Sequence, residues 1–223
     1  MSEGDIELCG LKARWQAVAV AGHTYRVLVP QRPEELIDTP AVVERFERDE
    51  YLPYWAELWP SAVRLAELVA DWRCPAVRVL DLGCGLGLVS LALARAGHAV
   101  TAGDYDADAL RFVEANAAAN GLPGVQTMLI DWRSSYSGLR FERIVAADVL
   151  YERRHVPAVA GFVARHLTAD GEAWLVDPQR AIAGDLPAAA RACGLEVSER
   201  TLPCDAGEAG ERLFVLTRRG PRA

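Results

Sequence analysis

The sequence predicts an α/β fold, a three-layer sandwich in which helices cover both faces of a mostly parallel, seven-stranded sheet. From Val77 onward, short apolar runs alternate with segments of helical composition, which is typical of parallel sheets. The last two apolar runs, Leu195–Thr201 and Arg212–Thr217, are separated only by the acidic, glycine-bearing loop Pro203–Glu211. Because this loop is too short for a crossover helix, we expect the last strand to run antiparallel.

The length of the chain favours one large domain with a small extension. At 223 residues, of which 51% are hydrophobic, the chain can bury most of its apolar surface in a single core. We expect residues 1–52 to form an N-terminal hairpin and helix extension, and residues 53–223 to form the main domain.

The extension and the start of the main domain have clear local signals. Two β-prone runs, Arg14–Val20 and Thr24–Val29, flank a glycine-containing turn and indicate a hairpin. Pro40–Tyr51 has the composition of a charged helix. An aromatic segment flanked by prolines follows, Pro53–Pro60, and Pro60 fits the first position of a helix that extends to about Asp71.

The main domain is then read as alternating strands and helices. Asp106 fits a helix N-cap and Gly121 a helix stop, which bounds one of the helices. The expected strands of this part are Val77–Leu82, Ala99–Ala102, Val125–Ile130, Phe141–Ala147 and Glu172–Val176, and the expected helices are Leu86–Ala96, Asp106–Asn120, Val156–Leu167 and Ile182–Cys193.

Charge and composition argue against several classes of protein. The net charge is −7 and no basic stripe is present, which disfavours nonspecific nucleic-acid binding. No apolar run is long enough for a membrane helix, and the acidic N-terminus lacks the order of a secretory signal. The five cysteines show neither C-x-x-C pairs nor metal-ligand spacing. We therefore expect a cytoplasmic protein with free thiols, no metal, no membrane partner and no nucleic-acid partner.

A glycine-rich turn follows the first strand of the main domain. The stretch Val77–Gly87, VRVLDLGCGLG, reads as a buried strand that ends near Asp81 and enters a turn with Gly83, Gly85 and Gly87. Glycines let the backbone approach a ligand closely, and a nucleotide-like cofactor is the usual occupant of such a strand–turn–helix. The spacing is G-x-G-x-G rather than the G-x-G-x-x-G of dinucleotide binding, so a dehydrogenase is a distant alternative. An acid just before the first glycine suits a ligand with an ammonium group.

Four consecutive strands end in aspartate. In an open α/β sheet, ligands bind outside the carboxyl ends of the strands, where such side chains gather. Asp104 lies 17 residues after Gly87, near where a carboxylate accepts hydrogen bonds from a ribose. The four strand-end acids are Asp81, Asp104, Asp131 and Asp148.

These motifs resemble those of a known enzyme superfamily. Residues 81–110, DLGCGLGLVSLALARAGHAVTAGDYDADAL, resemble motif I through the ribose acid of the class I, seven-β-strand, Rossmann-like S-adenosylmethionine-dependent methyltransferases. Within it, Ile130-Asp131-Trp132, the D-x-x-Y motif Asp148–Tyr151 and the segment PYWAELWP at 53–60 resemble the family 16 protein-lysine and nicotinamide N-methyltransferase-like group. Residues 53–223 would then be an S-adenosylmethionine-binding methyltransferase domain.

The resemblance implies roles for individual residues. Asp148 and Tyr151 would face the transferred methyl group and would be the catalytic pair, with Asp148 also near the cofactor. The expected cofactor-binding residues are Asp81, Gly83, Cys84, Gly85 and Gly87 for the methionine part, Asp104 for the ribose, Asp131, Trp132 and Tyr105 for the adenine, and Trp55 and Trp59 closing the site from the N-terminal side.

The expected function is methylation of a lysine on a protein substrate with S-adenosylmethionine as cofactor. Two alternatives stay open: N-methylation of a small amine such as a nicotinamide-like base, and a non-catalytic cofactor-binding interaction domain. Two further features are weaker candidates: His155 as an acid or base, because it lies close to Asp148 in the sequence, and the segment Asp177–Arg180, either as lining of the acceptor pocket or as a strand-end turn.

Overall fold

A computed structural model describes residues 6–203 and 210–218 of the chain. Its main sheet has the order β6-β5-β4-β7-β8-β10-β9. Neighbours from β6 to β8 pair in parallel, and β10 pairs antiparallel with both β8 and β9. The mostly parallel seven-stranded sheet with an antiparallel last strand is therefore confirmed. The strands are β4 (Arg78–Leu82), β5 (Ala99–Asp104), β6 (Gln126–Leu129), β7 (Phe141–Ala147), β8 (Leu167–Asp177), β9 (Leu195–Thr201) and β10 (Arg212–Arg218).

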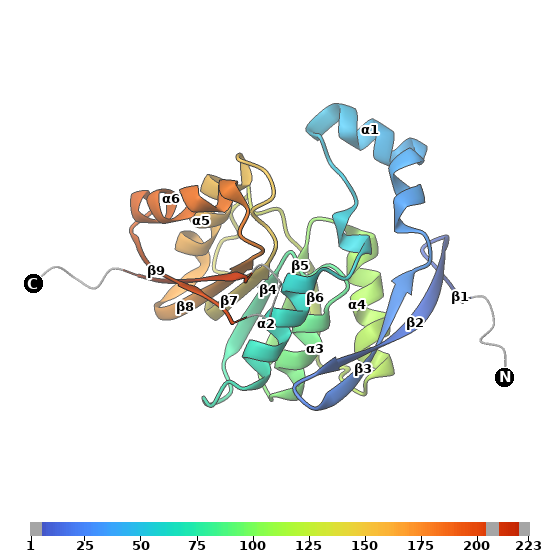
Figure 1. Ribbon diagram of the computed structural model, residues 1–223, viewed down its shortest axis with the longest axis horizontal. Coiled ribbons are helices and arrows are strands. Elements are labelled where there is room, and N and C mark those ends of the chain that lie inside the picture. The colour runs from blue at the N-terminus through green and yellow to red at the C-terminus, as the bar shows by residue number, and fades with distance from the viewer. Residues whose placement is uncertain (1–5, 204–209, 219–223) are drawn as a thin grey trace, which may run out of the picture.

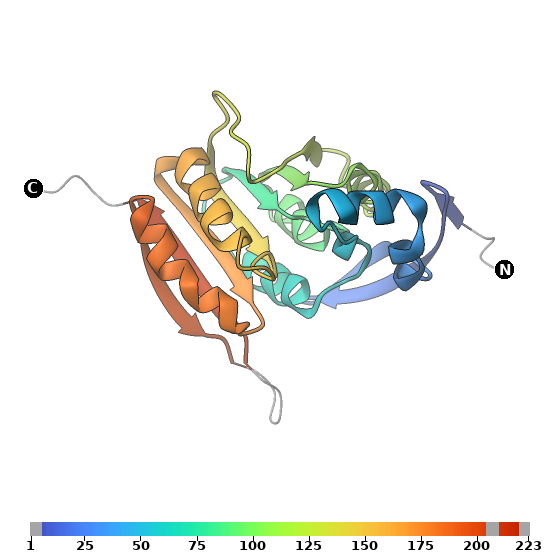
Figure 2. The ribbon, with the colours of Figure 1, turned by 90° about the horizontal axis from the view of Figure 1, so that it is seen from above.

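Helices cover both faces of this sheet (Figures 1 and 2). Successive side chains of a strand point to opposite faces, so Val79 of β4 joins one buried cluster and Leu80 joins the other. The first cluster lies under α2 (Pro60–Ala70), α3 (Leu88–Arg95) and α4 (Ala107–Ala119). The second lies under α5 (His155–His166) and α6 (Leu186–Ala192). This arrangement leaves the carboxyl ends of the parallel strands as one open edge.

The N-terminal hairpin packs against the outside of α4. It forms a second, antiparallel sheet of β1 (Ile6–Leu8), β2 (Leu11–Val20) and β3 (His23–Pro30), so the structure adds one short strand to the expected pair. The Asn116 side chain of α4 accepts from the Leu28 backbone N–H at 2.6 Å and donates to the Leu28 carbonyl. Because Asn116 is fully buried, these bonds fix the hairpin to the main domain.

The segment between the hairpin and the main sheet crosses the open edge. It contains a 3-10 helix η1 (Pro33–Asp38), helix α1 (Pro40–Asp49) and a short turn η2 (Tyr54–Ala56). Helix α1 projects from the body of the molecule and ends at Glu50, whose φ of 57° is left-handed (Figure 1). The chain then returns toward the sheet through the aromatic segment.

The elements differ from the sequence-based expectation at three places. The expected helix Ile182–Cys193 is split into η3 (Ala181–Asp185) and α6, since Pro187 fits only a first helical turn and starts a new helix. Strand β8 begins at Leu167 rather than Glu172, and β6 ends at Leu129, so Ile130–Trp132 is a loop. Most of the loop Pro203–Glu211 lies outside the described residues. Among the described residues, no helix combines the length and apolar character needed to cross a bilayer.

Candidate active site

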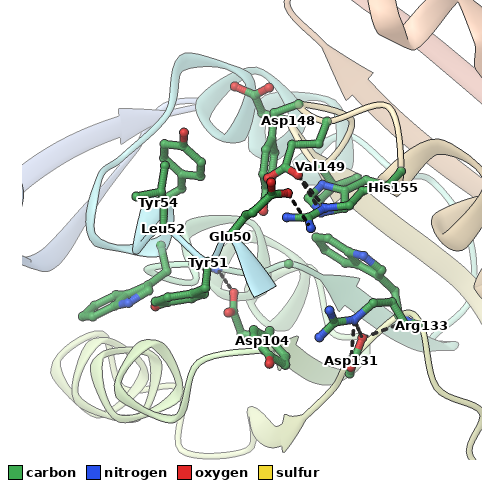
Figure 3. Close-up of a pocket in the computed structure, with 18 of the residues that line it drawn as sticks. Glu50, Tyr51, Leu52, Tyr54, Asp104, Asp131, Arg133, Asp148, Val149 and His155 are labelled. Atoms are coloured by element: carbon green, nitrogen blue, oxygen red, sulfur yellow. Dashed lines mark hydrogen bonds and ion pairs between the residues drawn. The ribbon is translucent and has the colours of Figure 1, made fainter. Parts of the chain in front are cut away.

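A pocket of about 850 Å³, including its mouth, lies at the carboxyl edge of the parallel strands. Its walls come from the turn after β4, the ends of β5, β6 and β7, the start of α5 and the segment Asp49–Trp59 (Figure 3). A smaller hollow continues beneath the glycine turn and shares Trp59, Gly83 and Gly85 with the larger pocket. Because the two hollows share these lining residues, they lie next to each other on the two sides of the glycine turn.

The glycine turn depends on two positions that exclude a side chain. Gly83 has a φ of +70°, and a Cβ there would lie 2.8 Å from a Val149 methyl carbon. Gly87 has a φ of +82°, and a Cβ there would lie 2.8 Å from a Val113 methyl carbon. Both the left-handed backbone and the close packing therefore require glycine. Cys84 is buried in the same turn and burial raises the pKa of its thiol, so it packs as a small neutral side chain.

Asp81 lies below the turn, in the smaller hollow. Its side chain is 2% exposed and accepts a hydrogen bond from the Ser90 hydroxyl at 2.7 Å. Burial raises the pKa of this carboxyl to about 7. Asp81 therefore supplies a carboxylate whose ionised form would be stabilised by a cationic group placed in the hollow.

The raised pKa of Asp81 predicts a specific pH dependence of stability. Unfolding returns the carboxyl to its ordinary pKa near 4, so between about pH 4 and pH 7 the folded state binds more protons than the unfolded state. The contribution of Asp81 to the free energy of unfolding therefore falls as pH rises through this window, by about 1.4 kcal/mol for each unit of pKa difference. We expect Asp81→Asn to lose this decline. Urea unfolding of both proteins at pH 5 and pH 8 measures it, and equal declines would contradict a buried, protonated Asp81.

Asp104 lies at the centre of the pocket, against the glycine turn. One carboxylate oxygen accepts from the Gly85 backbone N–H at 2.9 Å, and the other accepts from the Asp106 backbone N–H at 3.0 Å. A carboxylate has about four lone-pair sites, so acceptor capacity remains toward the pocket. Burial raises the pKa of Asp104 to about 6. The structure thus fixes Asp104 where it can accept from hydroxyl groups of a ligand.

Two residues expected at the adenine end are engaged by neighbours. Asp131 accepts from the Arg133 side-chain Nε at 2.9 Å and from the Arg133 backbone N–H. The hydroxyl of Tyr105 donates to Asp49 at 2.9 Å, and the Arg133 guanidinium lies 5.0 Å from the Tyr105 ring centre. Trp132 also lines this part of the pocket. Arg133 is an unpredicted member of the site, and no sequence motif marked it.

The two tryptophans of the aromatic segment occupy different positions. Trp59 lines both hollows, and its indole N–H donates to the Tyr54 carbonyl at 2.8 Å. Trp55 is 8% exposed and packs on Phe112 of α4, with 5.3 Å between ring centres. Trp55 therefore contributes mainly a buried wall behind Gly85, whereas Trp59 and the exposed Tyr54 lie at the opening.

The expected catalytic pair, Asp148 and Tyr151, lines the pocket directly after β7. Asp148 has a left-handed φ of 54°. Its two carboxylate oxygens accept hydrogen bonds from Nε and Nη2 of Arg180, at 2.7 and 3.0 Å. This bidentate pair offsets the negative charge of Asp148. The sequence did not indicate the pairing. The Tyr151 ring packs edge-on against Tyr54 and His155, at 5.0 and 4.6 Å between centres. Burial raises the pKa of Tyr151, so its hydroxyl is protonated at neutral pH.

An unpredicted arginine connects the N-terminal segment to α5 across the pocket. Arg154 pairs with Glu50 at 2.8 Å and with Glu152 at 2.6 Å, and it donates to the Asp49 carbonyl at 2.9 Å. His155, the next residue, lies between the Trp132 and Tyr151 rings, and burial lowers its pKa so that it is neutral at pH 7. Its imidazole packs as part of an aromatic wall.

The charge of the pocket is strongly negative. Six carboxylate side chains line it, but only two guanidinium groups, and both of these pair with lining carboxylates. Such a lining attracts cationic ligands. The carboxylates are Asp49, Glu50, Asp104, Asp131, Asp148 and Glu152. Within the described ranges, no group of three or more histidine, cysteine, aspartate or glutamate residues has the geometry of a metal site.

Comparisons with known proteins agree with this geometry. Residues 61–183 match the model of the methyltransferase small domain family. The chain is 49% identical over 49 residues to an uncharacterized RNA methyltransferase of Protochlamydia amoebophila, covering 22% of this chain and 11% of that protein. It is 34% identical over 82 residues to the ubiquinone biosynthesis O-methyltransferase of Haemophilus ducreyi, covering 36% of this chain and 35% of that protein. The chain thus spans only about a tenth to a third of these two relatives.

A solved structure extends the similarity to most of the fold. The TehB-like SAM-dependent methyltransferase of Corynebacterium glutamicum superposes with a TM-score of 0.57 at 22% identity, over 81% of this chain and 100% of that one. At 22% identity, this similarity is evidence for a shared fold only.

The pocket fits S-adenosylmethionine on the observations above. The turn excludes side chains at Gly83 and Gly87, Asp81 and Asp104 present carboxylates to the two adjacent hollows, and the acidic lining suits a cationic cofactor. The family match and the fold confirm S-adenosylmethionine as the expected cofactor. The chain belongs to the methyltransferase small domain family, with the class I, Rossmann-like fold of the S-adenosylmethionine-dependent methyltransferases.

Proposed function

We propose that this methyltransferase transfers its methyl group to the side-chain nitrogen of a lysine on a protein substrate. The observation that carries the proposal is the acidic and aromatic mouth of the pocket. Tyr54 and Tyr151 present rings there, and Glu50 and Glu152 present carboxylates. Aromatic faces and carboxylates together attract a long side chain that ends in an ammonium group.

The residues of the cofactor half keep the roles that the motif resemblance implies. In this proposal, Asp104 accepts from the ribose hydroxyls, Asp131 and Trp132 contact the adenine, and Tyr105 packs beside it. Asp81 and the Gly83–Gly87 backbone hold the methionine part. Residues 53–223 form the catalytic domain, and residues 1–52 form an extension that packs on it. The two-hollow shape and the burial of Asp81 and Asp104 support these assignments.

Alignment and deprotonation of the acceptor are the chemical tasks of the remaining residues. S-adenosylmethionine, when bound, supplies a methyl group on a sulfonium that is also the leaving group. The transfer forms an N–C bond and breaks the C–S bond, so the pocket contributes mainly by holding the acceptor in line. A lysine must first lose a proton to solvent, since its ordinary pKa is about 10.4. Enclosure between Tyr54 and Tyr151 favours the neutral amine by desolvation.

The ion pair between Asp148 and Arg180 fits this requirement. A free carboxylate next to the acceptor would stabilise the ammonium form, which cannot attack. Because both oxygens of Asp148 are bound by Arg180, its carboxylate stabilises a neighbouring ammonium less than an unpaired one. Asp148 can still accept a hydrogen bond from the neutral amine and orient it.

The acidic pocket also argues against transferring to this chain the two activities named for its relatives, RNA methylation and O-methylation. RNA is a polyanion, and both the net charge of −7 and the carboxylate-lined mouth oppose its approach. The matched segments cover a minor part of each relative. The charge favours a cationic acceptor over RNA. It also favours an amine, which approaches as an ammonium group and is attracted by the carboxylates, over a neutral hydroxyl group.

The proposal predicts where the methyl group will be found. Incubation of a cell lysate with the enzyme and deuterated-methyl S-adenosylmethionine should label lysine side chains in the protein fraction. Mass spectrometry of the protein and small-molecule fractions measures this, with Asp148→Asn as the inactive control. Label found only in small molecules would instead indicate a small-amine methyltransferase. Label on other protein residues would contradict the lysine assignment, and absence of any turnover would indicate a non-catalytic cofactor-binding domain.

A further inference from the structure

A projecting segment, residues 33–50, stands at the rim of the pocket, and we call it the acidic arm. It consists of η1, α1 and the left-handed residue Glu50. Two side chains on the inner side of α1 tether it to the main domain. Arg45 pairs with Asp106 at 2.7 Å, and Asp49 accepts from the Tyr105 hydroxyl at 2.9 Å. The rest of α1 stands away from the sheet (Figures 1 and 2).

The arm carries an apolar flank that no described part of the chain covers. Ile37, Val43 and Phe46 are 47%, 45% and 46% exposed, and they make up three of the five large exposed hydrophobic residues in the described part of the chain. Val43 and Phe46 lie three residues apart on one side of α1. Leu36 and Val42, in contrast, are buried. The arm therefore uses one apolar side for its own packing and presents a second one outward.

Acidic residues surround this flank. Residues 33–50 contain seven acidic side chains and two basic ones, and one of the basic ones, Arg45, is paired with Asp106 outside the arm. Three of the acidic residues, Glu35, Asp49 and Glu50, pair with Arg32, Arg133 and Arg154 outside the arm. The other four acidic residues leave the arm with an excess of negative charge next to its exposed apolar side chains. The acidic residues are Glu34, Glu35, Asp38, Glu44, Glu47, Asp49 and Glu50.

The apolar flank leads directly to the pocket mouth. The Glu50 backbone N–H donates to the Phe46 carbonyl at 2.8 Å, which places Phe46 one helical turn before Glu50. Glu50 lines the mouth and pairs with Arg154 on its far side. A chain segment that lay along the flank would therefore continue into the pocket.

We propose that the acidic arm is the docking surface for the protein substrate. This inference rests on the proposed function and adds the recognition element. The segment it binds carries an apolar side chain, which packs against Val43 and Phe46, and further lysine or arginine residues beside the methylated lysine. Complementary charge favours this occupant over a second copy of the chain, because two acidic arms repel each other.

Two double variants test the arm, each with a matched control. Val43→Ser with Phe46→Ser removes the apolar flank, and its control is Leu129→Ser, an exposed apolar residue on β6 outside the arm. Glu44→Lys with Glu47→Lys reverses charge on α1. Its control is Glu196→Lys, an exposed acidic residue on β9. Circular dichroism and calorimetric affinity for S-adenosylmethionine establish that each variant folds.

Methylation is then measured on two probes. The first is the protein fraction of a lysate, freed of small molecules by gel filtration. The second is Nα-acetyl-lysine amide at millimolar concentration, which is too short to reach the arm from the pocket. We expect both arm variants to label the protein fraction about tenfold more slowly or worse, the usual cost of removing a central interface contact. Both should methylate the short amide within about twofold of wild type, and the control variants should match wild type on both probes.

The outcomes separate failure of the docking surface from failure of the proposed function. If wild type labels protein lysines and the arm variants do so at the same rate, the arm is not the docking surface. If wild type labels no protein lysine, the proposed function fails and the docking proposal fails with it. If light scattering shows a wild-type dimer that Val43→Ser with Phe46→Ser converts to a monomer, the flank is a self-interface and the proposal is overturned.

Discussion

Replacing Asp104 with alanine should weaken the binding of S-adenosylmethionine by about 1–3 kcal/mol, between roughly fivefold and 150-fold in dissociation constant. Asp104 is buried at the centre of the pocket, and backbone bonds from Gly85 and Asp106 hold its carboxylate still. Alanine removes the acceptor for the ribose hydroxyls and leaves the Gly85 N–H without its partner. The demethylated product should lose affinity to a similar degree, since it has the same ribose.

Calorimetry with Asp104→Ala, Asp104→Asn and Asp108→Ala measures this effect. Asp108 supplies a nearby carboxylate that does not line the pocket, so its removal should leave the affinity within about twofold of wild type. Unchanged affinity in Asp104→Ala would mean that the ribose lies elsewhere in the pocket.

The pH dependence of binding gives a second readout of Asp104. Burial raises the pKa of this carboxyl to about 6, and the hydrogen bonds from a ribose require the ionised form. The contribution of Asp104 to the affinity should therefore be fully present above about pH 7 and should be lost as pH falls through 6. Asp104→Asn should bind more weakly and should show a smaller decline, which comes from Asp81, whose pKa burial raises to about 7. A wild-type affinity that stays constant down to pH 5 would contradict the role.

Asp148→Asn should lower kcat/KM by about 10²-fold and keep the cofactor dissociation constant within a few-fold of wild type. Asp148 lies at the acceptor side, where its carboxylate is positioned by the Arg180 fork. Asparagine keeps the size of the side chain but weakens the pair with Arg180, so the group that orients the amine loses its position. Steady-state kinetics on the protein fraction, together with calorimetry, separates rate from cofactor binding.

Arg180→Gln is the matched variant for the same pair. It leaves the Asp148 carboxylate without its bidentate partner, and a freer carboxylate stabilises the ammonium form of the acceptor. The pH at which kcat/KM reaches its maximum should therefore move upward, because a higher pH is needed to produce neutral amine. Equal losses of cofactor affinity and turnover in Asp148→Asn would instead assign Asp148 to cofactor binding.

The part of the site built from strand ends was predictable from the sequence. Asp104 ends β5, Asp148 directly follows β7, and Asp131 lies in the loop just after β6. Because these strands are parallel, the fold alone brings the three residues to one edge, and all three line the pocket. Asp81 ends β4 in the same way but lies in the smaller hollow beneath the turn. The glycine turn was also predictable from the sequence, because the left-handed backbone at Gly83 and Gly87 requires glycine.

The partners of these acids could not be predicted. Arg180 follows Asp148 by 32 residues, and Arg154 meets Asp49 across 105 residues. Such pairs depend on how loops fold over the sheet edge, which neither apolar periodicity nor a local motif encodes. The sequence placed Arg180 in a turn that could line the acceptor pocket but gave no sign of its pair with Asp148, and the arginine-rich composition gave no reason to single out Arg133 or Arg154.

Local propensity also failed where tertiary packing decides the conformation. The short run Ile6–Leu8 forms a strand only because β2 offers its edge. Trp55 lines the pocket as expected, but its burial against Phe112 follows from the apolar surface of α4 behind the glycine turn, which the local sequence does not indicate.

Direct titration of the cofactor tests the central claim, that the glycine turn and the strand-end acids form one S-adenosylmethionine pocket. Isothermal calorimetry should show one site per chain for S-adenosylmethionine and for its demethylated product. The two ligands should compete, and Asp104→Ala should weaken both. NAD titrated under the same conditions should give no measurable heat of binding. Tight binding of NAD with no binding of S-adenosylmethionine would contradict the account.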